Sequence, residues 1–256
     1  MSPEIIILCI AAFGAGFIDA IVGGGGLVQT PALMVTLPQY SLATLLGTTK
    51  IPAISGTAMA AYQYAFKVKL KWKLLALMCN IALLAAYAGS VTVTLVSNTS
   101  MKPIFFLMLI VVFIYTYTKK DFGLTKEKAI PIKKEYFYCC IAAIIIGFYD
   151  GFMGPGTGSF LILFFISIVG FDFLRASAHA KLVNIATNLG SIFFFSHSGH
   201  ILYHYAIPMA VFNLLGAILG ARLAILKGNK FIRIFFLIVI TGTIIRFGYD
   251  IFLKNH

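Results

Sequence analysis

The same set of residues occurs twice in this chain, 131 positions apart and without a gap, inside sequence that is otherwise apolar. Gly16-Phe17-Ile18-Asp19 aligns with Gly147-Phe148-Tyr149-Asp150, and Lys50 aligns with Lys181. A glycine-rich stretch follows each aspartate. A duplicated acid, glycine break and lysine within apolar segments are typical of membrane transporters built from two related halves. The sequence therefore predicts two repeats with a functional site where they meet.

Apolar segments dominate the composition, because 60% of the 256 residues are hydrophobic and only 11% are charged. Runs of about 20 such residues cross the ~30 Å hydrocarbon core as helices that bond their own backbone groups. The predicted fold class is an all-α integral membrane protein. The expected segments are 5–22, 27–37, 41–66, 74–96, 99–118, 137–153, 159–170, 173–196, 206–226 and 232–252. They form a first repeat over 1–118 and a second over 136–256, joined by a charged linker over 119–135.

Two of the predicted segments are short and follow glycine-rich breaks. Segment 27–37 has eleven residues, fewer than the roughly 17 that a spanning helix needs, and it follows four glycines at 23–26. Segment 159–170 follows the matching break at 154–158. We expect a pair of half-helices around each break. Whether the short segments cross the membrane or are re-entrant stays open.

The distribution of basic residues determines how the net charge of +12 is interpreted. The basic residues gather in three links: 67–73, 119–134 and 227–233. This pattern favours cytoplasmic loops rather than a nucleic-acid groove. Link 67–73 aligns with 198–204, which has no Lys or Arg, and 97–100 aligns with 228–231 inside a basic link. The pattern predicts two inverted-topology repeats, with both termini outside and the central linker cytoplasmic.

Four charged residues lie within the repeated motifs: Asp19, Lys50, Asp150 and Lys181. A charge at the centre of a spanning helix costs roughly 2.5–3.5 kcal/mol, so these residues are expected to be paired, functional or both. Backbone N–H groups at a half-helix start can also hold an anion, although glycines serve close helix packing equally well. The predicted substrate-binding residues are Lys50, Lys181, Gly24, Gly25, Gly26, Thr48, Gly156, Thr157, Gly158, Ser159, Asn184 and Asn188.

Coupling to protons is predicted at Asp19, Asp150 and His179. An anion that competes with each aspartate for its lysine would favour uptake of a proton together with the substrate. The alternative is that the two Asp–Lys pairs only fix helix packing, and that packing alone satisfies His179. A metal site at His197, His200 and His204 is not expected, since no carboxylate or thiol accompanies them, and no cofactor is predicted.

Four strings carry a resemblance to a known family: GFIDAIVGGGGLVQTPAL (16–33), LLGTTKI (45–51), GFYDGFMGPGTGSF (147–160) and ASAHAKLVNIATNLGS (176–191). They resemble the TauE/SafE sulfite exporter family, also known as the 4-toluene sulfonate uptake permease family. The resemblance covers essentially the whole chain. It implies a bacterial inner-membrane protein that moves sulfur-containing anions such as sulfite or sulfonates.

The predicted function is a secondary transporter that moves a small sulfur-containing anion by proton-coupled alternating access between the repeats. A passive anion channel is the first alternative. An intramembrane enzyme is the second, disfavoured because the chain has no HExxH motif and no nucleophile with a plausible base. The expected partners are the anion, protons and the lipid bilayer. Substrate identity, direction of transport, coupling ion and oligomeric state stay open.

Overall fold

The computed structural model describes residues 2–95 and 131–252, which form helices and the links between them. The elements are α1 (Pro3–Val22), α2 (Gly26–Thr36), α3 (Leu42–Ala65), α4 (Trp72–Val93), α6 (Ile132–Phe152), α7 (Thr157–Phe164), the π-helical turn η2 (Phe165–Val169), α8 (Phe173–His197) and α9 (Tyr203–Phe252). The predicted all-α class is confirmed. The predicted segment 99–118 lies outside the described residues.

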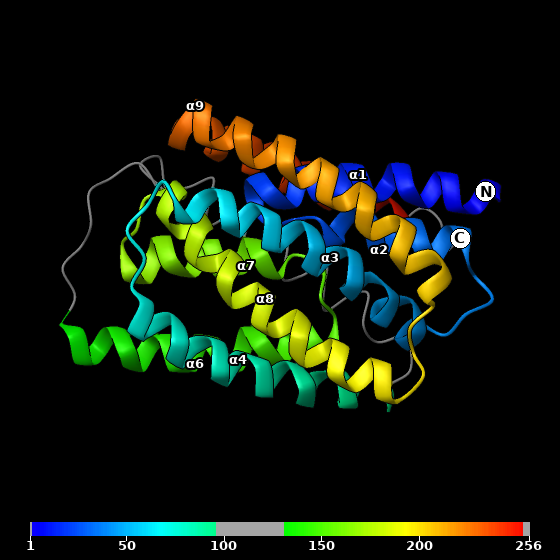
Figure 1. Ribbon diagram of the computed structural model, residues 1–256, viewed down its shortest axis with the longest axis horizontal. Coiled ribbons are helices and arrows are strands. Elements are labelled where there is room, and N and C mark those ends of the chain that lie inside the picture. The colour runs from blue at the N-terminus through cyan, green and yellow to red at the C-terminus, as the bar shows by residue number, and fades with distance from the viewer. Residues whose placement is uncertain (1, 96–130, 253–256) are drawn as a thin grey trace.

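Four helices in the described part of the chain are long and apolar enough to span a membrane: α1, α4, α6 and the first part of α9. Helices α3 and α8 have 24 and 25 residues, about 36 Å at 1.5 Å per residue, but carry more polar side chains. They cross the middle of the bundle, between α1 and α9 on one edge and α4 and α6 on the other (Figure 1). The chain is therefore a multi-pass membrane protein whose most polar helices are internal.

Two helix boundaries differ from the expected segments. Helix α6 begins at Ile132, inside the predicted linker, directly after Pro131. Its first turn is held by an ion pair between Lys71 Nζ and Glu135 Oε1 at 2.6 Å. The predicted segments 206–226 and 232–252 lie together in α9, which is interrupted at Gly228 by non-helical backbone with φ of 69°. Glycine adopts that conformation without the steric cost that other residues meet.

In each repeat, the last helix that the structure describes packs against helices of the other repeat. Helix α9 packs along α1 and α3, and α4 packs along α6 and α8. The close contacts match at the 131-residue offset, because Gly16 faces the carbonyl of Asn213 and Gly147 faces the carbonyl of Ala82. We call α1, α2, α3 and α9 bundle A, and α4, α6, α7 and α8 bundle B. The main contact between the bundles is α3 against α8.

Two matched hydrogen bonds fix the links that cross between the bundles. The N–H of Lys71 donates to His179 Nε2 at 3.1 Å, and the N–H of Leu202 donates to Thr48 Oγ1 at 3.0 Å. Both the two donors and the two acceptors are related by the 131-residue offset. Each bond therefore holds the start of α4 or α9 on the central helix of the other repeat.

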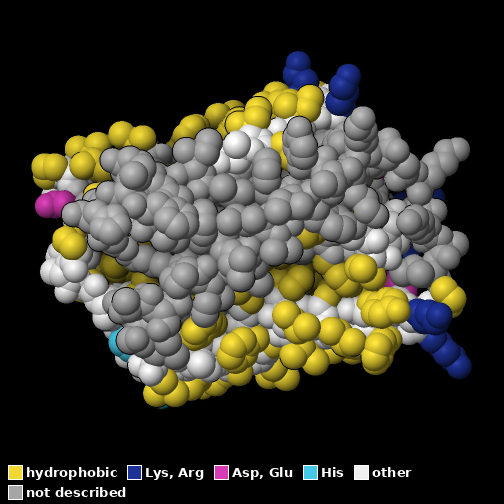
Figure 2. Space-filling view, turned by 180° about the vertical axis from the view of Figure 1, so that it is seen from behind, with side chains coloured by type: hydrophobic (Ala, Val, Ile, Leu, Met, Phe, Trp, Pro, Cys, Tyr) yellow, Lys and Arg dark blue, Asp and Glu magenta, His cyan; other side chains and the backbone are white. Residues whose placement is uncertain are grey.

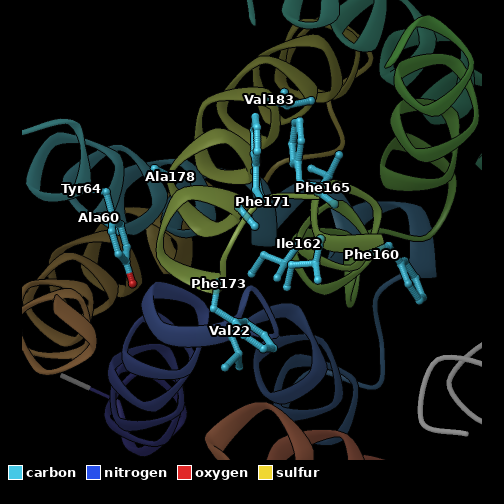
Figure 3. Packing of buried hydrophobic residues seen from close by; sticks show 14 of the residues in the cluster. Val22, Ala60, Tyr64, Phe160, Ile162, Phe165, Phe171, Phe173, Ala178 and Val183 are labelled. Carbon is cyan, nitrogen blue, oxygen red and sulfur yellow. The ribbon is translucent and has the colours of Figure 1, made fainter. Parts of the chain in front are cut away.

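The largest apolar core lies where α7, η2 and α8 meet α1 and α3 (Figure 3). Phe165 and Phe171 stack with ring centroids 5.7 Å apart, and the His179 ring lies against both. On the face seen in Figure 2, the visible Lys and Arg side chains lie toward one end of the long axis, and apolar side chains cover the visible flanks. Helix α1 runs from the labelled N-terminus toward the end where α6 begins, and α6 runs in the opposite direction (Figure 1).

Candidate functional site

Two buried ion pairs connect the repeats crosswise. Lys50 Nζ lies 3.0 Å from Asp150 Oδ2, and Lys181 Nζ lies 2.8 Å from Asp19 Oδ2. The side chains of Lys50, Asp150 and Lys181 are at most 4% exposed, and that of Asp19 is 15% exposed. Each lysine therefore neutralises the aspartate of the other repeat, and both pairs join bundle A to bundle B.

The ends of α1 and α6 position the ammonium groups. Lys50 also donates to the carbonyl of Asp150 at 2.7 Å, and Lys181 donates to the carbonyl of Asp19. These carbonyls lie in the last turn of their helices, where the helix dipole adds negative partial charge to that of the carboxylate. Left-handed Gly154, with φ of 83°, leaves room for the lysine, since a Cβ there would lie 3.2 Å from Lys50 Nζ. Each helix end is thus a binding site for a lysine of the other repeat.

The two glycine breaks contact each other through their backbones. A Cβ on Gly23 would lie 2.3 Å from the carbonyl carbon of Gly158, so neither position tolerates a side chain without displacement. Ser159 bonds the end of α1 twice, from its N–H to the Gly23 carbonyl at 3.2 Å and from Oγ to the Val22 carbonyl at 2.9 Å. The half-helices α2 and α7 therefore begin next to each other, at the contact between the repeats.

A cavity of about 40 Å³ lies at this contact. A cavity of this size has room for a few waters or a small group of atoms and not for a large organic molecule. The lining residues come from both bundles: Asp19, Gly23, Gly25, Gly26, Gln29, Thr30, Thr49, Lys50, Ala53, Thr57, Asp150, Gly154, Pro155, Gly156, Thr157, Gly158, Asn184, Asn188 and Asn213.

Most of the predicted site residues lie around this cavity. Those that line it are Asp19, Gly25, Gly26, Lys50, Asp150, Gly156, Thr157, Gly158, Asn184 and Asn188. Lys181 lies one contact away, bonded to Asp19. Gly24 and Ser159 are not among the lining residues, and Ser159 is bonded to the end of α1.

Thr48 and His179 lie elsewhere, at the links described above. His179 Nδ1 contacts the Arg175 carbonyl at 2.8 Å, and its Nε2 accepts the N–H of Lys71. Because the first nitrogen must donate and the second must accept, the hydrogen bonds hold the ring in one neutral tautomer. Neither Thr48 nor His179 reaches the cavity lining.

Several lining residues were not predicted from the sequence. Thr57 Oγ1 donates to Asp19 Oδ2 at 3.0 Å, so it shares that carboxylate with Lys181. Gln29 and Asn213 are carboxamides that are each 2% exposed, on α2 and α9. An isolated carboxamide in an apolar segment is a recognisable signal. A search for repeated residues misses both, because the aligned residues are Phe160 and Ala82.

One of the three histidines considered for a metal site, His200, lies in the link between α8 and α9. Its Nδ1 is 3.1 Å from Thr44 Oγ1 of α3. Within residues 2–95 and 131–252, no three His, Cys, Asp or Glu side chains are grouped closely enough to hold a metal ion.

Long apolar helices, two contacting half-helix breaks and crossed ion pairs around a small cavity define a multi-pass membrane protein of the transporter class. The profile described as Sulfite exporter TauE/SafE matches residues 8–247. The chain belongs to the TauE/SafE sulfite exporter family, as its motifs predict.

Relatives of similar length carry transporter names. The chain is 34% identical over 240 residues to "Probable membrane transporter protein ORF9" of Sinorhizobium sp, covering 93% of this chain and 90% of the relative. It is 33% identical over 242 residues to "Probable membrane transporter protein YfcA" of Escherichia coli K12, covering 93% and 88%. A "Probable membrane transporter protein" of Haemophilus influenzae is 33% identical over 229 residues, covering 89% and 88%. No solved structure gives a significant match.

Proposed function

We propose that this protein is a secondary transporter that moves a small sulfur-containing anion across the bacterial inner membrane, with proton coupling and alternating access. The observation that carries the proposal is the crossed arrangement of the two buried Lys–Asp pairs at the contacting glycine breaks. The membership in a sulfite exporter family supports the class of substrate. The transporter names of the relatives support transport rather than catalysis.

The first step is exchange of a carboxylate for the substrate at Lys50. Each ammonium is neutralised by an aspartate, so the four groups together carry no net charge. An anion that contacts Lys50 leaves Asp150 buried without its counter-charge. A buried charge that loses its partner costs about 3–5 kcal/mol, and uptake of one proton removes that cost. Binding of a monovalent anion together with one proton keeps the site neutral.

The second step is movement of bundle A against bundle B. Both ion pairs cross the boundary between the bundles, so they oppose separation of the bundles. Displacement of Asp150 from Lys50 by an anion removes one of these connections. The moving units in this mechanism are therefore the bundles, each of which contains one helix from the other repeat, rather than the two sequence repeats themselves.

We further propose that the repeats are inverted, with the N-terminus outside and the starts of α4 and α6 on the cytoplasmic side. The opposite courses of α1 and α6 support this orientation (Figure 1). Trp72 and Tyr203, which match at the 131-residue offset, begin α4 and α9 and are 64% and 48% exposed. Exposed aromatic side chains of this kind sit at membrane interfaces.

The test is uptake of sulfite into vesicles that contain the purified full chain. We expect saturable flux, and a decrease of at least about tenfold in Lys50→Ala and in Lys181→Ala. The first variant removes a charge-assisted contact to the anion, and the second leaves Asp19, which lines the cavity, without its counter-charge. Lys69→Ala, an exposed lysine in the link before α4, serves as the matched control and should leave flux unchanged. Full flux in both site variants would refute the site. Flux that never saturates would identify a passive channel.

A further inference from the structure

Two carboxamides form a directed chain of hydrogen bonds on one wall of the cavity. Gln29 Nε2 donates to the Thr49 carbonyl at 3.2 Å, and Asn213 Nδ2 donates to Gln29 Oε1 at 3.0 Å. A carbonyl oxygen can only accept, so it determines which end of each amide faces its neighbour. The chain connects α9 through α2 to the residue that precedes Lys50.

Two glycines, Gly16 and Gly56, leave the space that the Asn213 side chain occupies. A Cβ on Gly56 would lie 2.0 Å from Asn213 Oδ1, and one on Gly16 would lie 2.9 Å from the same atom. At the 131-residue offset, Asn213 aligns with Ala82 and Gly56 aligns with Thr187. The combination of this asparagine with a glycine opposite it therefore occurs in one repeat only.

Helix packing does not require this carboxamide. The carbonyl of Ala82 packs against Gly147 as the carbonyl of Asn213 packs against Gly16, so a methyl side chain is enough for the same contact. Burying an amide in an apolar bundle costs free energy unless its hydrogen bonds are made. Asn213 and Gln29 are hydrogen-bonded to each other through their side chains, and both line the cavity. Their presence there indicates a role toward the ligand.

We propose that Gln29 and Asn213 determine selectivity, by favouring oxyanions over halides of the same charge. The inference rests on the proposed function of the cavity. The charge of Lys50 attracts any small anion and does not distinguish one from another. A halide is a single atom, whereas an oxyanion places several oxygens around its centre and contacts Lys50 and the carboxamide wall together. Sites that hydrogen-bond a polar group discriminate strongly against ligands that lack it.

The experiment measures how sulfite, methanesulfonate and chloride raise the thermal stability of the purified full chain at constant ionic strength. We expect the oxyanions to bind more tightly than chloride in the unmodified protein. Asn213→Ala, which introduces the residue found at the aligned position, should lower this preference at least about tenfold, the effect of one hydrogen bond to a charged group. Chloride affinity should not change.

Two further variants make the test specific. Gly56→Ala should displace the Asn213 side chain and cause the same loss of preference. Gln63→Ala removes a carboxamide that also joins α3 to α9, by a bond to the Ile218 carbonyl at 3.4 Å outside the cavity lining, and it should leave the preference unchanged.

The outcomes separate this inference from the proposed function. If Lys50→Ala abolishes stabilisation by all three anions but Asn213→Ala keeps the full preference, the selectivity role is overturned and the site stands. If Lys50→Ala leaves stabilisation by every anion unchanged, the proposed anion site itself is overturned.

Discussion

At the scale of residues, the proposed site is built on two lysines that each neutralise an aspartate of the other repeat. The duplicated acid and lysine were predicted from the sequence, because buried charges are rare enough in apolar segments to be conspicuous. The pairing of each lysine with the aspartate of the other repeat could not be predicted in this way. An alignment of the repeats shows which residues are alike, but it does not show which residues are in contact. The Gln29–Asn213 pair could not be found by repetition, because it exists once.

Removal of one member of a buried pair should destabilise the protein more than removal of both. Asp150→Ala leaves Lys50 charged among buried groups and should lower the free energy of unfolding by about 3–5 kcal/mol. The double variant Lys50→Met, Asp150→Ala removes both charges and should recover much of that loss. Equilibrium unfolding in detergent of these variants and of Lys50→Met alone completes the double-mutant cycle.

The partly exposed ion pair between Lys71 and Glu135 serves as a comparison for the buried Lys50–Asp150 pair. The Lys71 side chain is 38% exposed, so solvent screens that interaction and Glu135→Gln should cost less than Asp150→Ala. Equal losses for the two variants would contradict the assignment of Lys50–Asp150 as a buried pair.

At the scale of elements, apolar runs and glycine breaks predicted most helices within a few residues. The early start of α6 was missed, because the Lys71–Glu135 contact that holds its first turn is distant in sequence. The positions of Thr48 and His179 were also beyond prediction. Each binds the last residue of a link from the other repeat, directly before α4 or α9, and nothing in the local sequence specifies that partner.

The two matched link bonds predict crossed effects on hydrogen exchange. Thr48→Val removes the acceptor for Leu202 and should speed exchange in residues 198–203, while the link 66–71 keeps its rate. His179→Leu removes the acceptor for Lys71 and should have the reverse effect. Each loss corresponds to about 1 kcal/mol of local stability, or roughly fivefold in rate. If either variant speeds exchange in both links, the two hydrogen bonds do not hold their links independently.

At the scale of the whole molecule, the placement of α4 in bundle B and α9 in bundle A determines which parts would move together in the proposed mechanism. The 131-residue offset predicts two repeats and a site where they meet, and this division stays a prediction. The composition of the two bundles could not be predicted, because it depends on packing between helices that are distant in sequence. A motion of repeat against repeat and a motion of bundle against bundle therefore predict different distance changes.

Spin labels at exposed positions distinguish the two motions. Ile10 lies on α1, and the aligned residues Leu84 and Leu215 lie on α4 and α9. With Cys9, Cys79, Cys139 and Cys140 replaced, labels at 10 and 215 should keep their distance when sulfite is added, because both lie in bundle A. Labels at 10 and 84 should change theirs. The opposite result would show that the sequence repeats move as units.

The most direct test of the account is sulfite flux in vesicles under an imposed pH gradient, compared between the unmodified protein and the variants Asp19→Asn and Asp150→Asn. If Asp150 takes up a proton when an anion occupies Lys50, the gradient should drive sulfite accumulation by the unmodified protein. The Asn side chain cannot ionise, so accumulation should be lost in Asp150→Asn even where downhill flux remains, and the same loss in Asp19→Asn would show that the second pair also takes part. Accumulation by the unmodified protein that does not respond to the gradient would contradict proton coupling at the crossed pairs.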